Sequence, residues 1–198
     1  MKHRINESIV ILFVLILLDG CATMQSRWKE SDSENTIEAY EEFLYLHPKG
    51  QFSDEARSRL DSLYFRKAET SNLLENYEDY LRYCQNGKFV GKFVNEAKIK
   101  HEELCFHKAE ETHLLEDYVY YLKCYPNGRF SSEARLSHEE LYYKKALDEN
   151  TINSYLDLLT QYPDGRYANE IRTKLKNLTD AIKTVRVEIA NCKLKEMN

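Results

Sequence analysis

The strongest constraint on the fold is a sequence pattern that occurs four times along the chain. Its glycines recur at spacings of 37, 41 and 37 residues: Gly50, Gly87, Gly128 and Gly165. A proline stands two residues before three of these glycines, and Gln85 replaces it in the second copy. A tyrosine and then a leucine precede each glycine at fixed distances: Tyr40 and Leu44, Tyr77 and Leu81, Tyr118 and Leu122, Tyr155 and Leu159. This register indicates one structural repeat that is built four times.

Each repeat is predicted to contain two helices. Apolar residues of the first segment, such as Ile37, Tyr40 and Phe43, recur at helical spacing. This helix is predicted to begin at N-cap residues and to end at the glycine, which permits a left-handed turn: Asn35, Asn72, His113 and Asn150 are the predicted caps. The second helix is predicted to begin near Asp54, Asn95, Ser132 and Asn169. With only 6 glycines and 3 prolines in 198 residues, we expect an all-α fold.

One helical hairpin cannot bury its apolar face, but stacked hairpins can, which predicts an α-solenoid of about four helix-turn-helix repeats. The spacing resembles that of tetratricopeptide repeats, whose usual length is about 34 residues. The full string resembles a longer tetratricopeptide-like repeat of bacterial envelope lipoproteins, and the plan is similar to that of the BamD family. The four repeats are expected at about 28–64, 65–105, 106–142 and 143–178.

Residues 179–198 fall outside the repeat. Four apolar residues there fit one face of a helix: Ile182, Val185, Ile189 and Cys192. The stretch 184–189 also alternates as a strand would. The sequence favours a helix that caps the last repeat.

The N-terminal residues have the features of an export signal. A short basic start precedes an unbroken apolar run over 9–18, which is too short to cross a bilayer as a helix. The next residues, Leu-Asp-Gly-Cys21, resemble the lipobox of bacterial lipoproteins. This resemblance implies that 1–20 are a signal peptide and that Cys21, acylated with palmitate and other chains, is the lipid attachment site. An uncleaved anchor and a plain signal peptide are the alternatives.

The same resemblance gives an expected location. Ala22 after the cysteine implies sorting to the outer membrane, where the protein would face the periplasm. Residues 21–27 would form a short tether, so the repeats would lie close to the membrane.

The charges narrow the range of partners. A net charge of −5 excludes a generally basic nucleic-acid binder. Acidic residues gather on the first helices of the repeats, and this ordinarily solvated face is also a candidate binding face: Glu38, Glu41, Glu42, Glu75, Glu78 and Asp79. We therefore expect a non-catalytic scaffold that binds an envelope protein or peptide of unknown identity. A structural spacer without a specific ligand is an alternative.

Aromatic residues give a second route to a binding surface. Most of the 15 tyrosines and 8 phenylalanines fall at repeat positions and are expected in the core. Four others are candidates for the surface, where aromatic side chains often anchor partners: Tyr45, Tyr83, Tyr120 and Tyr125.

The sequence offers few groups for covalent chemistry. His101, Cys105 and His107 have a spacing that suggests a metal-dependent enzyme as an alternative function, but a tyrosine replaces the cysteine in the third copy. The pattern repeats with the unit and so indicates packing, we expect His107 to be an ordinary surface or capping residue, and we predict no cofactor, metal or catalytic residue. An oxidising compartment would allow disulfides, and the four cysteines besides Cys21 permit three full pairings that the sequence does not distinguish. Cys84 with Cys124 is the candidate pair, and small buried residues that fill gaps are the alternative.

Overall fold

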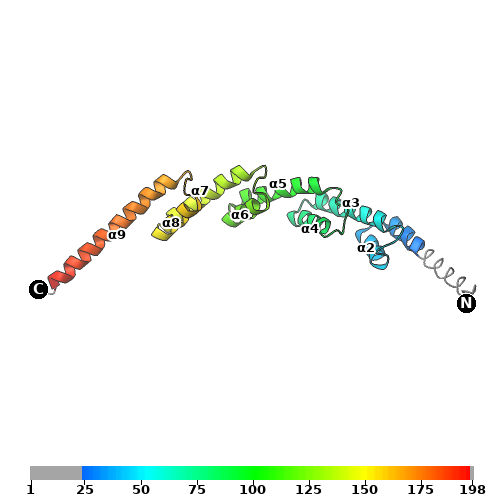
Figure 1. The fold of residues 1–198 in the computed structure, drawn as a ribbon, viewed down its shortest axis with the longest axis horizontal. Coiled ribbons are helices and arrows are strands. Elements are labelled where there is room, and N and C mark those ends of the chain that lie inside the picture. The colour runs from blue at the N-terminus through cyan, green and yellow to red at the C-terminus, as the bar shows by residue number, and fades with distance from the viewer. Residues whose placement is uncertain (1–23, 197–198) are drawn as a thin grey trace, which may run out of the picture. The chain divides into compact units, whose positions relative to one another are not determined.

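The computed structural model describes residues 24–196, and every regular element in that range is a helix (Figure 1). The all-α prediction is therefore confirmed for this part of the chain. Residues 24–34 are helical, and eight helices follow: α2 (Ile37–Leu46), α3 (Ser53–Ser71), α4 (Leu74–Gln85), α5 (Val94–Thr112), α6 (Leu115–Cys124), α7 (Ser131–Glu149), α8 (Ile152–Gln161) and α9 (Ala168–Glu196). The predicted signal peptide and Cys21 lie outside the described residues.

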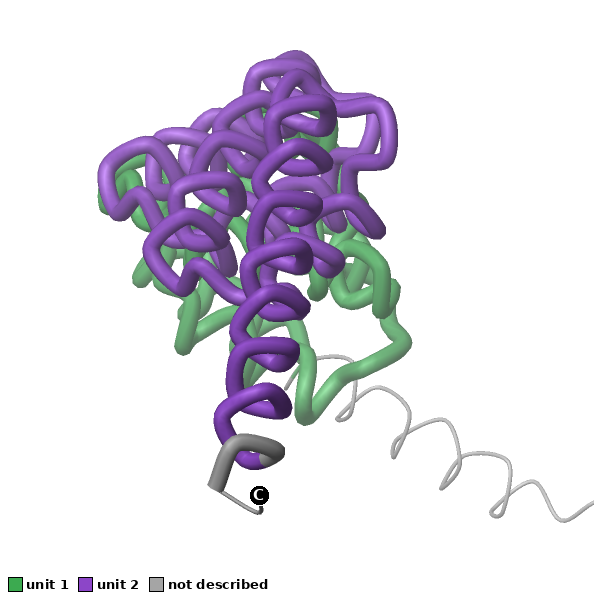
Figure 2. Tube along the Cα trace, turned by 90° about the vertical axis from the view of Figure 1, so that its left-hand side faces the viewer, with its two compact units in different colours: residues 1–101 green, residues 102–198 purple. Residues whose placement is uncertain are grey.

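The chain divides into two compact units, residues 1–101 and 102–198, and the division falls within α5 (Figure 2). In unit 1, the long helix α3 packs against the shorter helices α2 and α4. In unit 2, α7 packs against α6 and α8, and α8 packs against α9. Short helices of 10 to 12 residues thus alternate with helices of 19 residues or more, as the two-helix repeat predicts.

Two sets of predicted boundaries can be compared with the helices. The approximate breaks after residues 64, 105 and 142 fall inside α3, α5 and α7, and a division by helix places them at the turns that follow these helices. Of the predicted tether over 21–27, residues 24–27 are described, and they belong to the helix over 24–34.

The residues predicted to begin the short helices instead end the helices before them. They have positive φ angles of 46° to 52°: Asn35, Asn72, His113 and Asn150. The amide of Asn72, for example, donates to the carbonyl of Ala68 at 2.9 Å and closes the last turn of α3. Asparagine suits both an N-cap and this left-handed position, so its presence alone does not distinguish them. The N-caps are the next residues: Thr36, Leu73, Leu114 and Thr151.

Stacked aromatic rings join each long helix to the turn before the next long helix. The pairs have interplanar angles of 1° to 9°: Trp28–Phe52, Phe65–Phe93, Phe106–Phe130 and Tyr143–Tyr167. Their ring centroids lie 4.0 to 5.2 Å apart. We call these pairs the four ring stacks. The N-caps of α3 and α7 are Phe52 and Phe130, each a member of a ring stack, and not the predicted Asp54 and Ser132.

Two of the repeat glycines are required by a close contact and not by their backbone angles. A Cβ atom on Gly128 would collide with the carboxylate of Glu102, and one on Gly165 would collide with that of Glu139. Among the repeat glycines, only Gly87 has the left-handed backbone that the sequence predicts for all four, with a φ of 69°.

The last long helix departs from the pattern of the other three. In α3, α5 and α7, a buried or half-buried aromatic residue is followed three positions later by a buried alanine, such as Phe65 and Ala68 in α3. In α9 these two positions are Asp180 and Lys183. The helix continues to Glu196, so 179–196 is helical as predicted, but side chains 181–193 are exposed and do not cap the hairpin. Within the described residues, no helix combines the length and the apolar character that a bilayer crossing requires.

Candidate functional site

Unit 1 contains an open groove of about 430 Å³ between α2, α3 and the loop that follows α4. We call it the unit 1 groove, and its lining residues are Glu41, Leu44, Tyr45, Arg57, Leu60, Asn86, Gly87 and Lys88. Helix α2 contributes the first three residues, α3 the next two, and the loop the last three. The groove therefore depends on three separate segments of unit 1.

A salt bridge fixes the loop side of this groove. The Glu41 Oε1 atom accepts hydrogen bonds from the Tyr64 hydroxyl and from Lys88 Nζ, each at 2.7 Å. Burial opposes the charge on Glu41, but the hydrogen bonds from Lys88 and Tyr64 outweigh it and lower the pKa of the carboxyl group. The Lys88 ammonium also lies 4.2 Å from the centre of the Tyr83 ring. These contacts hold Lys88 at the groove.

The lining residues divide into those that belong to the repeat and those that do not. Arg57 Nη2 donates to the carbonyl of Pro48 at 2.6 Å, and Arg135 makes the equivalent bond to Pro126 in unit 2. An arginine at this position therefore holds the proline-containing turn in both units. Tyr45 has no aromatic counterpart in the other copies and is 85% exposed.

Lys88 also falls outside the repeat. The second copy contains four extra residues, because Gly-Lys-Phe-Val occurs twice between Gly87 and Val94. Lys92 and Phe93 take the repeat positions, since Phe93 stacks on Phe65. The extra Lys88 faces the groove, and two departures from the repeat, Lys88 and Tyr45, thus lie at one place.

The predicted acidic face is partly neutralised by its neighbours. Glu38, Glu42 and Glu75 are exposed. Glu41 is paired with Lys88, Glu78 lies 3.4 Å from a ring nitrogen of His101, and Asp79 is bonded to Arg82. Glu41 and Asp79 therefore have cationic partners within unit 1, which offset part of the negative charge that the sequence suggests.

The predicted surface aromatics differ in exposure. Tyr45 is the most exposed of the four, Tyr120 is 38% exposed, and Tyr83 and Tyr125 are half-buried.

The residues considered for a metal site lie in different surroundings. His101 is buried in unit 1, where burial lowers its pKa although Glu78 opposes that shift. In unit 2, Cys105 is buried, and His107 is exposed and lies 3.1 Å from Glu110. The described part of the chain contains no group of three histidine, cysteine, aspartate or glutamate side chains placed to hold a metal ion.

The lowered pKa of His101 predicts a loss of stability in acid. The unfolded chain, with an ordinary pKa of 6.5, takes up the proton before the folded chain does, so the free energy of unfolding should fall as the pH drops below about 6.5. One such histidine contributes a slope of at most about 1.4 kcal/mol per pH unit. Urea unfolding at pH 7 and pH 5.5 should show a smaller drop for His101→Gln than for the wild type. His107→Gln, at an exposed site, is the control and should keep the full drop. An unchanged drop in His101→Gln would contradict the prediction.

The structure describes both cysteines of the candidate disulfide. Cys84 and Cys124 are both thiols. Cys84 is half-buried in unit 1, where burial raises the pKa of its thiol, whereas Cys124 is exposed in unit 2 at the end of α6.

Buried acidic residues that hold the turns were not anticipated from the sequence. Asp61 is fully buried, its Oδ1 accepts from the Tyr80 hydroxyl at 2.5 Å, and its Oδ2 accepts from the backbone amide of Lys92 at 2.8 Å. The Tyr80 hydroxyl in turn accepts from the amide of Phe93 at 3.0 Å. We call this arrangement the turn network.

Unit 2 contains the same network with a longer acid. Glu102 Oε1 accepts from the Tyr121 hydroxyl at 2.9 Å and from the amide of Arg129 at 2.5 Å. Burial and the bond to Glu102 raise the pKa of Tyr121 to about 12, so the hydroxyl keeps its proton. In the sequence, both turn networks could have been recognised from an acidic residue that is followed 19 positions later by a tyrosine.

Comparison with protein-family models and with curated proteins found no match to this chain.

Proposed function

We propose that this chain is a non-catalytic bacterial lipoprotein that acts as a scaffold for a protein or peptide of the cell envelope. In this proposal, acylated Cys21 anchors it in the outer membrane on the periplasmic side. Its hairpins stack as a tetratricopeptide-like α-solenoid. The four ring stacks support that arrangement, because each one joins a long helix to the turn of the following hairpin.

The observation that carries the binding proposal is the coincidence of Tyr45 and Lys88 at the unit 1 groove. Residues that recur in every repeat are explained by packing, but these two do not recur and one of them is largely exposed. Leu44, which is half-buried, supplies apolar surface in the same groove. Tyrosine is enriched among the residues that dominate binding energy at interfaces.

The groove chemistry defines the partner. Two cations line it and both are paired within unit 1, Lys88 with Glu41 and Arg57 with Asp54. The partner segment should therefore present an apolar or aromatic side chain to Tyr45.

Crosslinking in living cells tests the proposal. We expect the full chain to capture a stoichiometric envelope partner. Tyr45→Ala should reduce that capture by about 30-fold if the tyrosine contributes the 2 kcal/mol typical of a dominant interface residue. Val119→Ala, which changes a 51% exposed residue on α6, is the control and should capture as much as the wild type.

A separate variant tests the anchor. Cys21→Ala should shift from the membrane fraction to the soluble fraction. If wild type and Cys21→Ala fractionate identically as soluble proteins, the lipoprotein proposal fails. If Tyr45→Ala captures the partner as well as Val119→Ala does, the groove is not the binding site.

A further inference from the structure

The C-terminal helix carries an apolar stripe that continues beyond the repeat positions. Its members are separated alternately by four and three residues, the spacing of coiled-coil positions a and d: Ile171, Leu175, Leu178, Ile182, Val185, Ile189 and Cys192. We call this stripe the α9 seam. Leu175, Ile182 and Ile189 take position a, and the others take position d.

The first half of the α9 seam is covered within unit 2. Ile171 is fully buried in a cluster with Tyr155 and Leu158 of α8, and Leu175 and Leu178 pack against the same cluster. The seam therefore begins as an established packing surface between α8 and α9.

The second half of the α9 seam is uncovered. Ile182 is 37% exposed, Val185 52% and Ile189 51%, and Cys192 is exposed as well. An isolated helical segment of this length is marginally stable in water unless an apolar face is packed. The α9 seam is thus packed against α8 in its first half and exposed in its second half.

We propose that this exposed half of α9 pairs with α9 of a second copy of the chain as a parallel, two-stranded coiled coil. The exposed a positions, Ile182 and Ile189, are both isoleucine, a residue that parallel two-stranded coiled coils favour at a. The inference does not depend on the unit 1 groove or on the lipid anchor.

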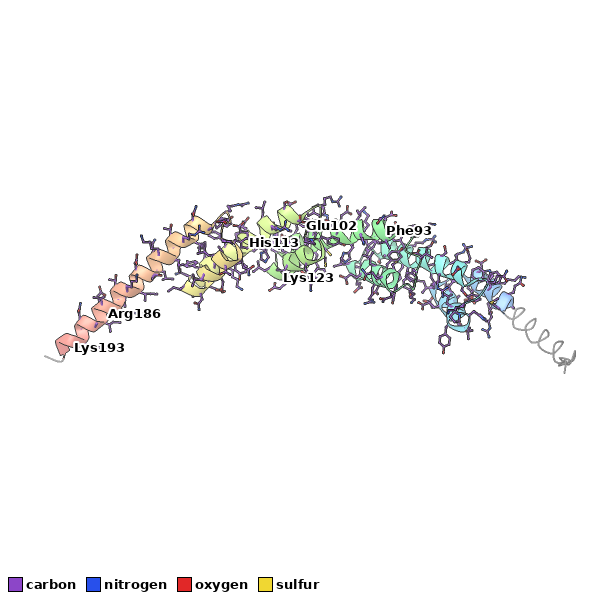
Figure 3. The ribbon with its side chains drawn as sticks, in the orientation of Figure 1. Phe93, Glu102, His113, Lys123, Arg186 and Lys193 are labelled. Carbon is purple, nitrogen blue, oxygen red and sulfur yellow. The ribbon has the colours of Figure 1, made fainter. Side chains whose placement is uncertain are left out.

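The charges beside the seam select a second copy in parallel orientation. Position e is occupied by Arg186 and Lys193, both labelled on α9 in Figure 3, and position g by Glu188. In a parallel pair, a g residue faces the e residue five positions later on the other helix, so Glu188 meets Lys193 of the second copy twice by symmetry. An antiparallel pair would instead place Arg186 and Lys193 opposite e residues, none of which is acidic along the exposed half.

Cys192 provides a direct test of register. In a parallel and in-register pair, each d residue faces its own counterpart, so the two Cys192 thiols come together. An antiparallel pair would separate them. Diamide can then link them, because it takes up the two protons and two electrons that are released as the S–S bond forms.

Sedimentation equilibrium of the purified full chain tests the association. We expect the wild type to sediment as a dimer and Val185→Asp to weaken dimerisation at least tenfold. Val187→Asp is a matched control, because Val187 is 59% exposed on the same helix but takes position f, away from the seam. A monomeric wild type, or a Val187→Asp variant as disruptive as Val185→Asp, would overturn the proposal.

Two further variants test orientation. Diamide should give a covalent dimer that is lost in Cys192→Ser and retained in Cys124→Ser, whose altered residue is also exposed. Glu188→Lys should weaken dimerisation at least threefold, and addition of Lys193→Glu to the same chain should restore it. A dimer that does not crosslink through Cys192, or whose dissociation constant does not change with these charge changes, would refute the parallel coiled coil.

Discussion

Replacement of Asp61 by alanine is expected to lower the free energy of unfolding by roughly 2–5 kcal/mol. The fully buried carboxylate of Asp61 accepts hydrogen bonds from the Tyr80 hydroxyl and from the amide of Lys92. Without it, both donors lose their partner, and an unsatisfied buried donor costs about 1–3 kcal/mol. Urea unfolding followed by circular dichroism measures the change.

Two other variants make this expectation specific. Asp61→Asn keeps an accepting oxygen and should fall between wild type and Asp61→Ala. Asp54→Ala removes a fully exposed carboxylate from the same helix and should change stability by less than about 1 kcal/mol. If Asp61→Ala were as mild as Asp54→Ala, the turn network would not hold the turn.

Phe106→Ala is expected to destabilise the protein by about 3–5 kcal/mol. Phe106 is 2% exposed, stacks on Phe130 with centroids 4.5 Å apart, and meets the edge of Tyr121 at 5.5 Å. Truncation removes a ring stack and leaves a cavity between α5 and the turn before α7. Calorimetric and urea unfolding should both report the loss.

The neighbouring residue supplies the control for this variant. His107→Ala alters an exposed side chain and should change the free energy of unfolding by less than about 0.5 kcal/mol. Phe106→Leu keeps most of the apolar volume and should recover more than half of the loss. Equal stability of Phe106→Ala and His107→Ala would show that the ring stack contributes little.

The helices and their order could be predicted because their signals are local. Apolar spacing and the proline–glycine turns mark the alternation of short and long helices, which the structure contains. The helix starts were misplaced, because asparagine serves equally well as an N-cap and as the left-handed residue that ends a helix. Asn72 takes the second role, and no neighbouring residue in the sequence indicates which role applies.

Contacts between segments could not be predicted in the same way. The sequence assigns Gly128 to a left-handed turn, whereas in the structure a Cβ atom there would collide with the carboxylate of Glu102 from α5 and with the Cβ of Tyr125. In the sequence, Asp61 cannot be distinguished from the many acidic residues at the surface, because its burial depends on the position of Tyr80. Tyr45 was recognisable as a candidate surface residue, but its proximity to Lys88 depends on how the extra loop returns to α2.

The change at Asp180 and Lys183 limits how such a chain can grow. A new hairpin docked after α9 would have to bury two charged side chains where the earlier hairpins meet an aromatic ring and an alanine. A hairpin inserted ahead of α8 would meet the usual surfaces on both sides. Duplication of a hairpin ahead of α8 would therefore lengthen the array. Helix α9 would stay the last helix of the array, and its exposed half would not be covered by a further hairpin.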